Sequence, residues 1–503
     1  MSRFSFLKVL AVGIFLILFS GLVNAQIFAG AYYRRLAQGN RLKEIILPAP
    51  RGIIFDKKGV TLVANTPIFE FDNQEISKDQ AISLEAVGQK VAVISKREYL
   101  FGSLLAHVLG YVNSDGVGQN GLESFYENLL KGKNGKELVE TDAMGEKLRV
   151  LSAVPAVAGK NLNLALDLDL QKAASLAMEN LPAGRQVKGA VVVSNPKTGE
   201  ILALYSSPSF DPNNVASYLE SPDQPLFNRA ISGAYPPGST FKLITAAAGL
   251  ETGAITKNTL IEDTGVITIG EYKFPNWKWL RGGGVDGWIN VVTALAKSND
   301  LFFYRVGEKT GIDNLILWAK KMGLGSVLGI DLPGEASGNV TKKEDWYLGD
   351  TYHWAIGQGD LLTTPLQVNA WTNVVASGGF LCQPHLSNLS HLSNLCKKTG
   401  LKPETTAVIK QGMVEACSPG GTAYPLFNFQ VSTSNIQLAC KTGTAEFGDP
   451  SASSGYSTHA WLTGFAPAND PEVSVTVLVE GGGEGSDVAA PIAKKVLEKW
   501  FGK

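Results

Sequence analysis

The segments of this chain that carry a β-strand pattern lie in two groups, far apart in the sequence. Two short apolar segments, 189–194 and 200–205, flank a turn and predict a β-hairpin. Three further strands are predicted at 436–444, 459–465 and 472–479, and the last repeats valine at every second position. The residues between the two groups are largely helical in pattern. A sheet that combines both groups must therefore be assembled from distant sequence, and we expect a cleft where it meets the helical part.

The length and composition of the chain limit its class. At 503 residues it is long enough for two or three domains, and its hydrophobic content of 45% allows a large core. The net charge of −1 does not favour nucleic acid as a partner. The four cysteines have no Cys-x-x-Cys spacing and do not form a metal framework. We expect no metal site and no cofactor. Cys417 and Cys440 are either bridged, in an oxidising compartment, or two buried thiols.

The N-terminus carries a long apolar segment. Two basic residues precede the apolar run 9–23, and the apolar character resumes at 27–33. Taken as one segment, 9–33 is long enough to cross a bilayer, whereas 9–23 alone followed by small residues is compatible with a cleaved secretory signal. We favour an uncleaved anchor, because the Tyr-Tyr-Arg-Arg sequence at 32–35 is typical of a membrane interface. Both interpretations place the rest of the chain outside the cytoplasmic membrane of a bacterium.

The stretch 234–250 has the pattern of a reactive serine at the start of a helix. Two prolines and a glycine bring the backbone to Ser239, and an apolar, alanine-rich helix is predicted to follow. Lys242 lies one turn later on the same face, where its amine can take the proton of Ser239 if the amine is neutral. Free lysine has a pKa of about 10.4, but burial and the positive end of the helix dipole both lower it. The stretch therefore predicts a Ser-Lys nucleophile.

Each short motif of this kind also occurs elsewhere in the chain, so its context has to select one copy. Ser-x-x-Lys occurs three times, and only the copy at Ser239 opens a predicted buried helix. Lys-Thr-Gly occurs four times, and only the copy at Lys441 continues a predicted strand, where Gly443 lets a substrate backbone lie close. Ser298 and Asp300, at the end of a helical run, are further candidates. A Ser-Lys enzyme needs such partners because it requires a second proton relay and an oxyanion site.

The order of these motifs carries a family resemblance. They match the three-motif set of penicillin-binding proteins and serine β-lactamases: Ser239-x-x-Lys242, Ser298-x-Asp300 and Lys441-Thr-Gly443. With further matching segments on both sides, the chain resembles a class B penicillin-binding protein over nearly its whole length. These segments are 51–52, 106–111, 121–123, 235–242, 311–313, 329–335, 356–359 and 364–367. Aspartate at position 300, where most relatives carry asparagine, makes the chain more similar to the elongation-type penicillin-binding protein 2 than to the division type.

The resemblance implies a multi-domain α+β fold. A transpeptidase domain of the penicillin-binding and β-lactamase-like type would contain an antiparallel five-stranded sheet with helices on both faces, plus a helical subdomain. The implied bounds are 1–33 for a cytoplasmic stub and transmembrane anchor, 34–158 for a smaller β-rich pedestal (dimerisation-like) domain, and 159–503 for the transpeptidase domain. The pedestal departs from the family, because only residues 68–96 separate Pro67 from Arg97, where relatives usually carry a much longer head insertion.

The resemblance also implies an activity, that of a peptidoglycan D,D-transpeptidase, a serine-type acyltransferase of cell-wall synthesis. Ser239 would attack the penultimate D-alanine of a pentapeptide stem, and the acyl group would pass to an amine of a neighbouring stem. Lys242 would be the base, and Ser298 and Lys441 would relay the proton to the leaving amine. The implied substrate-binding residues are Asp300, Thr442, Gly443 and Thr444, and the backbone N–H groups of Ser239 and Thr444 would form the oxyanion hole.

The partners and location follow from the same resemblance. The partners would be stem pentapeptides on a lipid-linked or nascent glycan strand, β-lactam antibiotics that acylate Ser239, the inner membrane, and elongation-machinery proteins such as a polytopic glycosyltransferase. The protein would cross the cytoplasmic membrane once, with its catalytic domain on the outer side.

Other functions would use the same motifs. A β-lactamase or a D,D-carboxypeptidase needs the same residues, but both normally lack an anchor and a pedestal. A non-catalytic β-lactam sensor or scaffold would tolerate loss of the serine or the lysines, and all three motifs are complete here. The sequence leaves open the acceptor residue of the stem, the choice between elongation and division, and the oligomeric state.

Overall fold

The computed structural model of the chain describes residues 3–72, 74–142, 144, 146–181, 187–388, 395–427, 429–431, 434–448 and 457–502. Packing divides the chain into two compact units. The smaller comprises Met1–Gly52 and Asn128–Lys160, and the larger comprises Ile53–Glu127 and Asn161–Lys503. The bounds 1–33, 34–158 and 159–503, which the family resemblance implies, differ from this division and stay a prediction.

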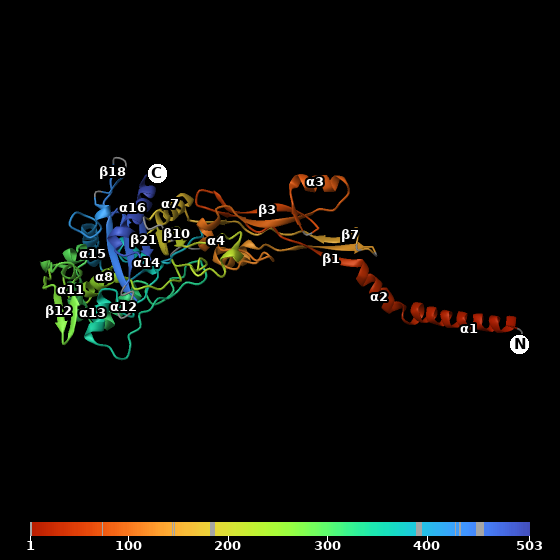
Figure 1. Ribbon diagram of the computed structural model, residues 1–503, viewed down its shortest axis with the longest axis horizontal. Helices are drawn as coiled ribbons and strands as arrows, with labels where there is room; N and C mark the ends of the chain where they lie inside the picture. Colours follow the sequence, from red (N-terminus) through yellow and green to blue (C-terminus); the bar gives the residue numbers. More distant parts are fainter. Residues whose placement is uncertain are drawn as a thin grey trace. The chain divides into compact units, whose positions relative to one another are not determined.

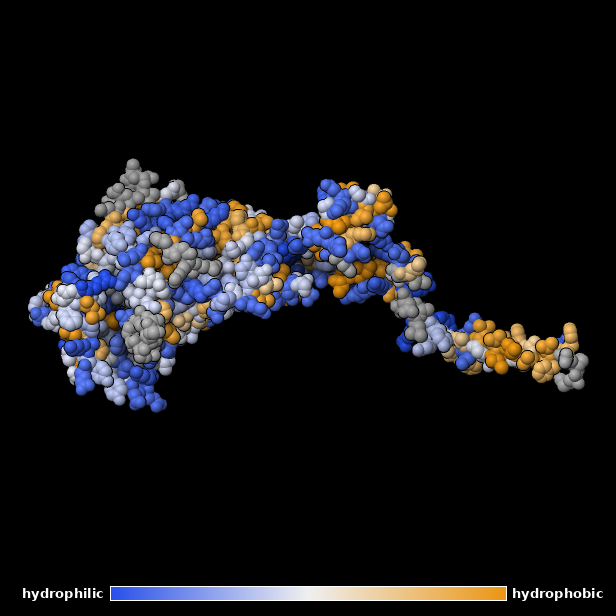
Figure 2. Space-filling view, in the orientation of Figure 1, coloured by the Kyte–Doolittle hydropathy of each residue, from blue (hydrophilic) through white to orange (hydrophobic). Residues whose placement is uncertain are grey.

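The smaller unit begins with the apolar N-terminal segment. Helix α1 (Arg3–Val23) continues through a π-helical turn (Asn24–Phe28) and is followed by α2 (Gly30–Arg41). The segment Phe4–Phe28 is long and apolar enough to cross a membrane, and Figure 2 shows the hydrophobic colour along this helix. An N-terminal helix of this kind fits a single-pass membrane anchor.

A three-stranded antiparallel sheet completes the smaller unit. Its order is β1-β6-β7, with β1 at Leu42–Leu47, β6 at Gly135–Thr141 and β7 at Lys147–Val154. Arg41 and Arg149 both form ion pairs with Glu140, which lies on the middle strand.

The N-terminal part of the larger unit contains a second small sheet. Its strands follow the order β4-β3-β2-β8, and β5 also pairs with β3. The bounds are β2 Ile54–Phe55, β3 Thr61–Phe71, β4 Gln74–Ile76, β5 Ala92–Tyr99 and β8 Leu162–Asn163. The helices of this stretch are α3 (Lys78–Ala86), a 3₁₀ turn (Gly102–Leu105), α4 (Ala106–Leu109) and α5 (Gly121–Phe125). Helix α6 (Glu127–Leu130) begins at Glu127, the last residue of this stretch, and its other residues belong to the smaller unit. A buried ion pair joins Arg97 to Glu123 at 2.7 Å.

The main sheet of the larger unit combines strands from distant parts of the sequence, as predicted. It is antiparallel and five-stranded in the order β10-β9-β21-β20-β19. The bounds are β9 Gly189–Ser194, β10 Ile201–Ser207, β19 Ala439–Phe447, β20 Ser457–Ala466 and β21 Val473–Val479. Strand β19, which carries the selected Lys-Thr-Gly motif, is therefore an edge strand.

Helices cover both faces of this sheet, which confirms the predicted fold class (Figure 1). The alternating valines of β21 pack against α7 (Leu168–Glu179) and α16 (Ala490–Phe501) on one face. On the other face, Ser474 and Thr476 accept hydrogen bonds from Asn369 of α14 (Pro365–Ala376), at 3.2 and 3.3 Å. The alternation read from the sequence thus separates an apolar face from a partly polar one.

The remaining helices lie between β10 and β19 in the sequence, in the predicted helical part. Helix α8 (Lys242–Glu251) is buried along almost its whole length in the largest apolar cluster. The other helices are α9 (Trp277–Leu280), α10 (Val291–Ala296), α11 (Asp300–Thr310), α12 (Ile312–Lys321), α13 (Leu348–Ala355) and α15 (Pro403–Ala416). Short strand pairs also occur here: β11 (Ile261–Asp263) with β14 (Gly287–Ile289), β12 (Val266–Ile269) with β13 (Tyr272–Pro275), β15 (Phe380–Cys382) with β16 (Cys396–Lys398), and β17 (Gln430–Val431) with β18 (Ser434–Asn435).

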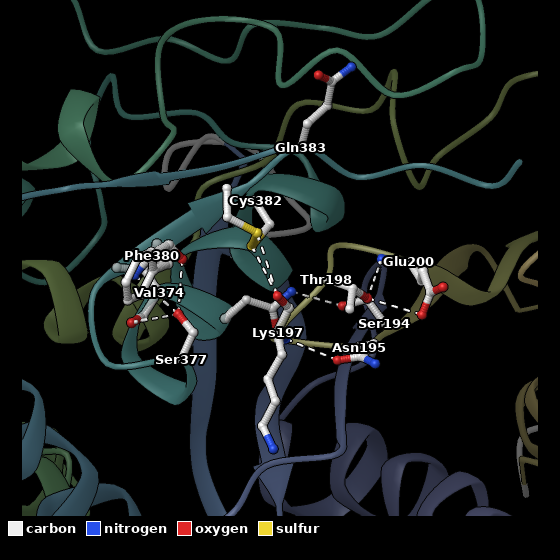
Figure 3. Close-up of a disulfide and its surroundings, with 12 residues drawn as sticks. Ser194, Asn195, Lys197, Thr198, Glu200, Val374, Ser377, Phe380, Cys382 and Gln383 are labelled. Carbon is white, nitrogen blue, oxygen red and sulfur yellow. Dashed lines mark hydrogen bonds between the residues drawn. A yellow bond between two sulfur atoms is a disulfide. The ribbon is translucent and has the colours of Figure 1, made fainter. Parts of the chain in front are cut away.

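The four cysteines form two disulfides. Cys417, at the end of α15, is bridged to Cys440 of β19, so the alternative with two free thiols is wrong for this structure. Cys382 is bridged to Cys396, a pair that the sequence analysis did not propose. Figure 3 shows this second disulfide beside the turn that carries Lys197, whose carbonyl oxygen lies 3.6 and 3.5 Å from the two sulfur atoms.

Candidate active site

Ser239 lies in a 3₁₀ turn, Gly238–Phe241, that leads directly into α8. Gly238 has a φ of +53°, and a β-carbon there would lie 2.7 Å from the carbonyl oxygen of Thr444. Only glycine avoids both the backbone strain and this overlap. The turn can therefore lie against the backbone of β19, with Ser239 half-buried between the helical part and the sheet.

Lys242 occupies the first position of α8, and its side chain is fully buried. Its Nζ lies 2.6 Å from Asp300 Oδ1, and it also donates to the carbonyl oxygen of Ser298 at 2.8 Å and to Ser298 Oγ at 3.4 Å. Burial lowers the pKa of Lys242, while the charge of Asp300 and its hydrogen bond act in the opposite direction. Within the described ranges, none of the hydrogen bonds of Lys242 ends on Ser239.

Ser298 connects the two lysines of the site. Lys441 is fully buried on β19, and its Nζ donates to Ser298 Oγ at 2.8 Å and to the carbonyl oxygen of Thr442 at 2.9 Å. Burial, and then the charge of Lys242, hold the pKa of Lys441 well below its ordinary value. Ser298 has a φ of +54°, a left-handed conformation that is uncommon for serine. The uncommon backbone conformation therefore occurs at the residue whose hydroxyl contacts both amines.

Asp300 is fixed from several sides. It begins α11, which Asn299 caps by accepting a hydrogen bond from the backbone N–H of Phe302 at 2.9 Å. Asp300 Oδ2 accepts from the backbone N–H of Trp277 at 3.0 Å, and the backbone N–H of Asp300 donates to Asn276 Oδ1 at 3.2 Å. With Lys242 on the other carboxylate oxygen, the group has little freedom to turn.

Strand β19 presents the remaining predicted residues. Thr442 Oγ1 lies 2.7 Å from Thr422 Oγ1, and Thr444 Oγ1 donates to Glu484 Oε2 at 2.9 Å. At Gly443 an added β-carbon would lie 3.0 Å from side-chain atoms of both Thr240 and Trp461. A side chain at 443 would therefore crowd the serine turn; the predicted approach of a substrate backbone to this glycine stays a prediction.

One cleft of about 930 Å³ brings these groups together. Its lining includes Ser239, Ser298, Asp300, Thr442, Gly443 and Thr444. Lys242 and Lys441 are fully buried and reach the cleft through Ser298. The sequence analysis missed four residues that bond to the predicted ones, and a fifth that bonds to one of the four. The four are Asn276, Trp277, Thr422 and Glu484, and the fifth is Arg281, which bonds to Glu484. They lie outside the short motifs, and no spacing in the sequence points to them.

The chemistry available in this cleft is acyl transfer: the hydroxyl of Ser239 lines the cleft, and a second hydroxyl, that of Ser298, contacts two amines. The amines have lowered pKa values, and a backbone edge lies next to the hydroxyl. In the part of the chain that the structure describes, no group of three or more His, Cys, Asp or Glu side chains is arranged to hold a metal ion.

Comparison with known proteins gives matches over nearly the whole chain. The family model described as "Penicillin binding protein transpeptidase domain" matches residues 189–498, and that described as "Penicillin-binding Protein dimerisation domain" matches residues 72–164. The peptidoglycan D,D-transpeptidase MrdA of Escherichia coli is 31% identical over 593 aligned positions, which cover 96% of this chain and 91% of that protein. The alignment is longer than this chain, so the relative carries residues that this chain lacks.

Two solved structures extend the comparison. The structure of penicillin-binding protein 2 in complex with MreC, from Helicobacter pylori, has a TM-score of 0.79 at 28% identity and covers 92% of this chain and 99% of that one. A chain of a peptidoglycan synthase complex, described as coordinating polymerization and crosslinking, has a TM-score of 0.79 at 30% identity and covers 100% of this chain and 98% of that one.

Proposed function

This chain belongs to the penicillin-binding protein transpeptidase family, and we propose that its cleft cross-links peptidoglycan stem peptides through an acyl-enzyme on Ser239. It is a peptidoglycan D,D-transpeptidase, and its similarity to MrdA and to penicillin-binding protein 2 indicates the elongation type. One observation carries the assignment of residues: a single hydroxyl, Ser298 Oγ, contacts both Lys441 and Lys242 in the cleft that Ser239 lines.

The first half of the reaction forms the acyl-enzyme. Ser239 Oγ attacks the carbonyl carbon of the penultimate D-alanine while its proton passes to neutral Lys242. The bond to the terminal D-alanine then breaks, and its amine leaves with a proton that Lys441 supplies through Ser298. Lys441 is neutral after this step, and Lys242 holds the proton that it took from Ser239.

The edge position of β19 supports the assignment of substrate-binding residues. An extended peptide can pair with an open strand edge by main-chain hydrogen bonds, and Gly443 leaves room for it. In this pose the backbone N–H groups of Ser239 and Thr444 face the tetrahedral oxygen, and Thr442 and Thr444 hold the terminal carboxylate. Asp300 positions Lys242.

The second half of the reaction transfers the acyl group. An amine of a neighbouring stem attacks the ester carbonyl and passes one proton through Ser298 to neutral Lys441, the bond to Ser239 Oγ breaks, and Lys242 returns its proton to that oxygen. We propose that the donor is a stem pentapeptide on a lipid-linked or nascent strand. β-Lactams acylate Ser239 in place of that donor.

The partners and location follow from the relatives. Penicillin-binding protein 2 of Helicobacter pylori occurs in a complex with MreC, and another chain similar to this one belongs to a peptidoglycan synthase complex, which supports elongation-machinery partners for this chain. We propose that these include a polytopic glycosyltransferase, and that the anchor α1 holds the catalytic unit on the outer side of the cytoplasmic membrane.

Labelling with a fluorescent penicillin tests the proposal. The purified full-length chain in detergent should acquire a stable covalent label, and Ser239→Ala should remove it. With lipid-linked substrate and a glycosyltransferase, the wild-type chain should form cross-linked dimers of stem peptides. Release of D-alanine without cross-links would indicate a carboxypeptidase, and rapid hydrolysis of the penicillin would indicate a β-lactamase. The absence of any label that depends on Ser239 would exclude all three enzymes.

A further inference from the structure

An ion pair spans the cleft from the helical part to the main sheet. Arg281, directly after α9, donates from Nη2 to Glu484 Oε1. Glu484 lies after β21, and its other oxygen, Oε2, accepts from Thr444 Oγ1 at 2.9 Å. All three residues line the cleft. Glu484 thus links the guanidinium of Arg281 to the hydroxyl of Thr444 on β19.

Arg281 is held in place by a fixed neighbour. Its guanidinium lies over the ring of Trp277, with Cζ 5.1 Å from the ring centroid. The indole N–H of Trp277 donates to the carbonyl oxygen of Lys297 at 3.1 Å, and the backbone N–H of Trp277 donates to Asp300 Oδ2 at 3.0 Å. The position of Arg281 is therefore linked to the same carboxylate that holds Lys242.

The guanidinium keeps donors available for a ligand. Its side chain is 57% exposed, and the contact with Glu484 uses one of the five N–H donors of an arginine. An arginine in this state can bind a second carboxylate with two parallel hydrogen bonds. Stacking on Trp277 limits the side-chain entropy that such binding would cost.

A carboxylate bound beside Thr444 on β19 would need a positive charge nearby. The donor peptide ends in a carboxylate, but Lys441 has its pKa held well below the ordinary value and is bonded to Ser298 and the Thr442 carbonyl oxygen. Glu484 by itself would repel an anion beside Thr444. The guanidinium of Arg281 carries the opposite charge and neutralises Glu484.

Two other cations of the cleft lining pair with a different carboxylate. Lys278 and Lys297 both pair with Asp286, at 2.7 and 3.2 Å. Lys273, on β13, is exposed and forms no ion pair within the described ranges. Arg281 is the cation of this lining that is tied to Thr444 by a chain of contacts.

We propose that Arg281, held by Glu484 and Trp277, binds the terminal carboxylate of the donor peptide beside Thr444. This inference rests on the proposed function. The carboxylate takes the free guanidinium donors, and the hydroxyl of Thr444 turns from Glu484 to the new anion. Glu484 and Trp277 are positioning residues, because they act through Arg281.

The test compares two ligands that differ only in this carboxylate. Acylation of the full-length chain is measured with benzylpenicillin and with its methyl ester, and the ratio of the two second-order rate constants is reported. Arg281→Gln should lower that ratio about 10- to 100-fold, since a hydrogen bond to a charged group is worth about that factor. The rate with the ester should change little. Arg281→Lys should recover part of the ratio, because it restores the charge without the fork.

The controls separate binding from screening and from misfolding. Lys273→Gln removes the same charge from the same cleft and should leave the ratio within about twofold, as expected for an exposed cation that is not tied to the ligand. Arg281→Gln with Glu484→Gln should stay well below wild type. A full return to the wild-type ratio in that double variant would mean that Arg281 only screens Glu484, and would overturn the proposal.

An unchanged ratio in Arg281→Gln, with wild-type acylation intact, would also overturn it and leave the transpeptidase function standing. Absence of acylation in the wild type would instead overturn the proposed function. Melting curves of each variant show whether the chain is folded, and Arg281→Lys gives the ratio if the glutamine variant is not.

Discussion

Replacing Asp300 with asparagine removes the carboxylate that contacts Lys242, at 2.6 Å from Nζ. In the wild type, burial lowers the pKa of Lys242 and Asp300 raises it, with burial the larger effect. Asparagine keeps the size and one oxygen acceptor of the side chain but loses the charge. The pKa of Lys242 should therefore fall, and at a given pH more of the lysine should be neutral. Because the neutral amine is the base, the acidic limb of the acylation profile should move to lower pH.

The size of this effect follows from the burial of the pair. Two unit charges about 4 Å apart interact with about 4 kcal/mol at an effective dielectric constant of about 20. Lys242 and Asp300 are closer than that, and their side chains are 0% and 12% exposed, so solvent screens them weakly. A factor of ten in a protonation equilibrium corresponds to about 1.4 kcal/mol. At a pH on the acidic limb, the acylation rate of Asp300→Asn, expressed as a fraction of its own plateau rate, should therefore be at least about tenfold higher than the same fraction for the wild type.

The plateau itself should fall, because asparagine holds the amine less firmly than a carboxylate does. The assay is the rate of labelling by a fluorescent penicillin across the pH range in which both proteins stay folded, with each profile normalised to its plateau. Glu446→Gln is the matched control, since Glu446 is another carboxylate of the cleft lining and does not contact Lys242. A limb that stays in place, or moves to higher pH, would refute the reasoning about Asp300.

Three further perturbations test other parts of the site. Gly238→Ala should lower the free energy of unfolding by about 1–2 kcal/mol for the left-handed backbone alone. It should also slow acylation strongly, since its β-carbon meets the Thr444 carbonyl oxygen at 2.7 Å. Denaturant titration measures the first effect and the rate of labelling the second. Lys441→Met should reduce acylation at least about 100-fold, the usual size of a lost proton relay, while the melting temperature stays the same or rises because a buried amine is replaced by an apolar group. Replacing both Cys417 and Cys440 with alanine should lower the free energy of unfolding by about 3 kcal/mol, the chain-entropy estimate for a loop of this length. The pH dependence of labelling should stay as in the wild type. An unchanged denaturation midpoint would contradict this prediction.

The parts of this protein that could be predicted are those in which one physical pattern repeats locally. The valines of 473–479 alternate, so β21 and its apolar face followed from the sequence. The helix after Ser239 followed from an apolar, alanine-rich run, and it ends shortly before Gly253, which has a φ of +76°. In both cases the local pattern and the tertiary packing favour the same conformation.

The parts that could not be predicted depend on contacts between loops. Arg281 and Glu484 lie 203 positions apart, and neither belongs to a periodic segment. Cys382 and Cys396 meet because β15 and β16 pair with these two residues opposite each other, a register that the intervening sequence does not reveal. Contacts of this kind are consequences of the assembled fold, so spacing in the sequence carries no signal for them.

The proton arrangement of the resting site follows from the same contacts. Two charged lysines beside one aspartate would bury a net positive charge, which is costly in a region that water does not reach. Lys441 has the more strongly depressed pKa, because it is buried and feels the charge of Lys242, whereas Lys242 has a carboxylate on its Nζ. The proton that the pair does hold should therefore lie between Lys242 and Asp300 in the resting state, with Lys441 neutral. Ser298, which contacts both amines, then offers the route by which this proton moves to Lys441 and frees Lys242 to act as the base. Removing the charge of Asp300 loosens the proton at its starting point, which is why that variant should keep a larger fraction of its plateau rate than the wild type does at low pH.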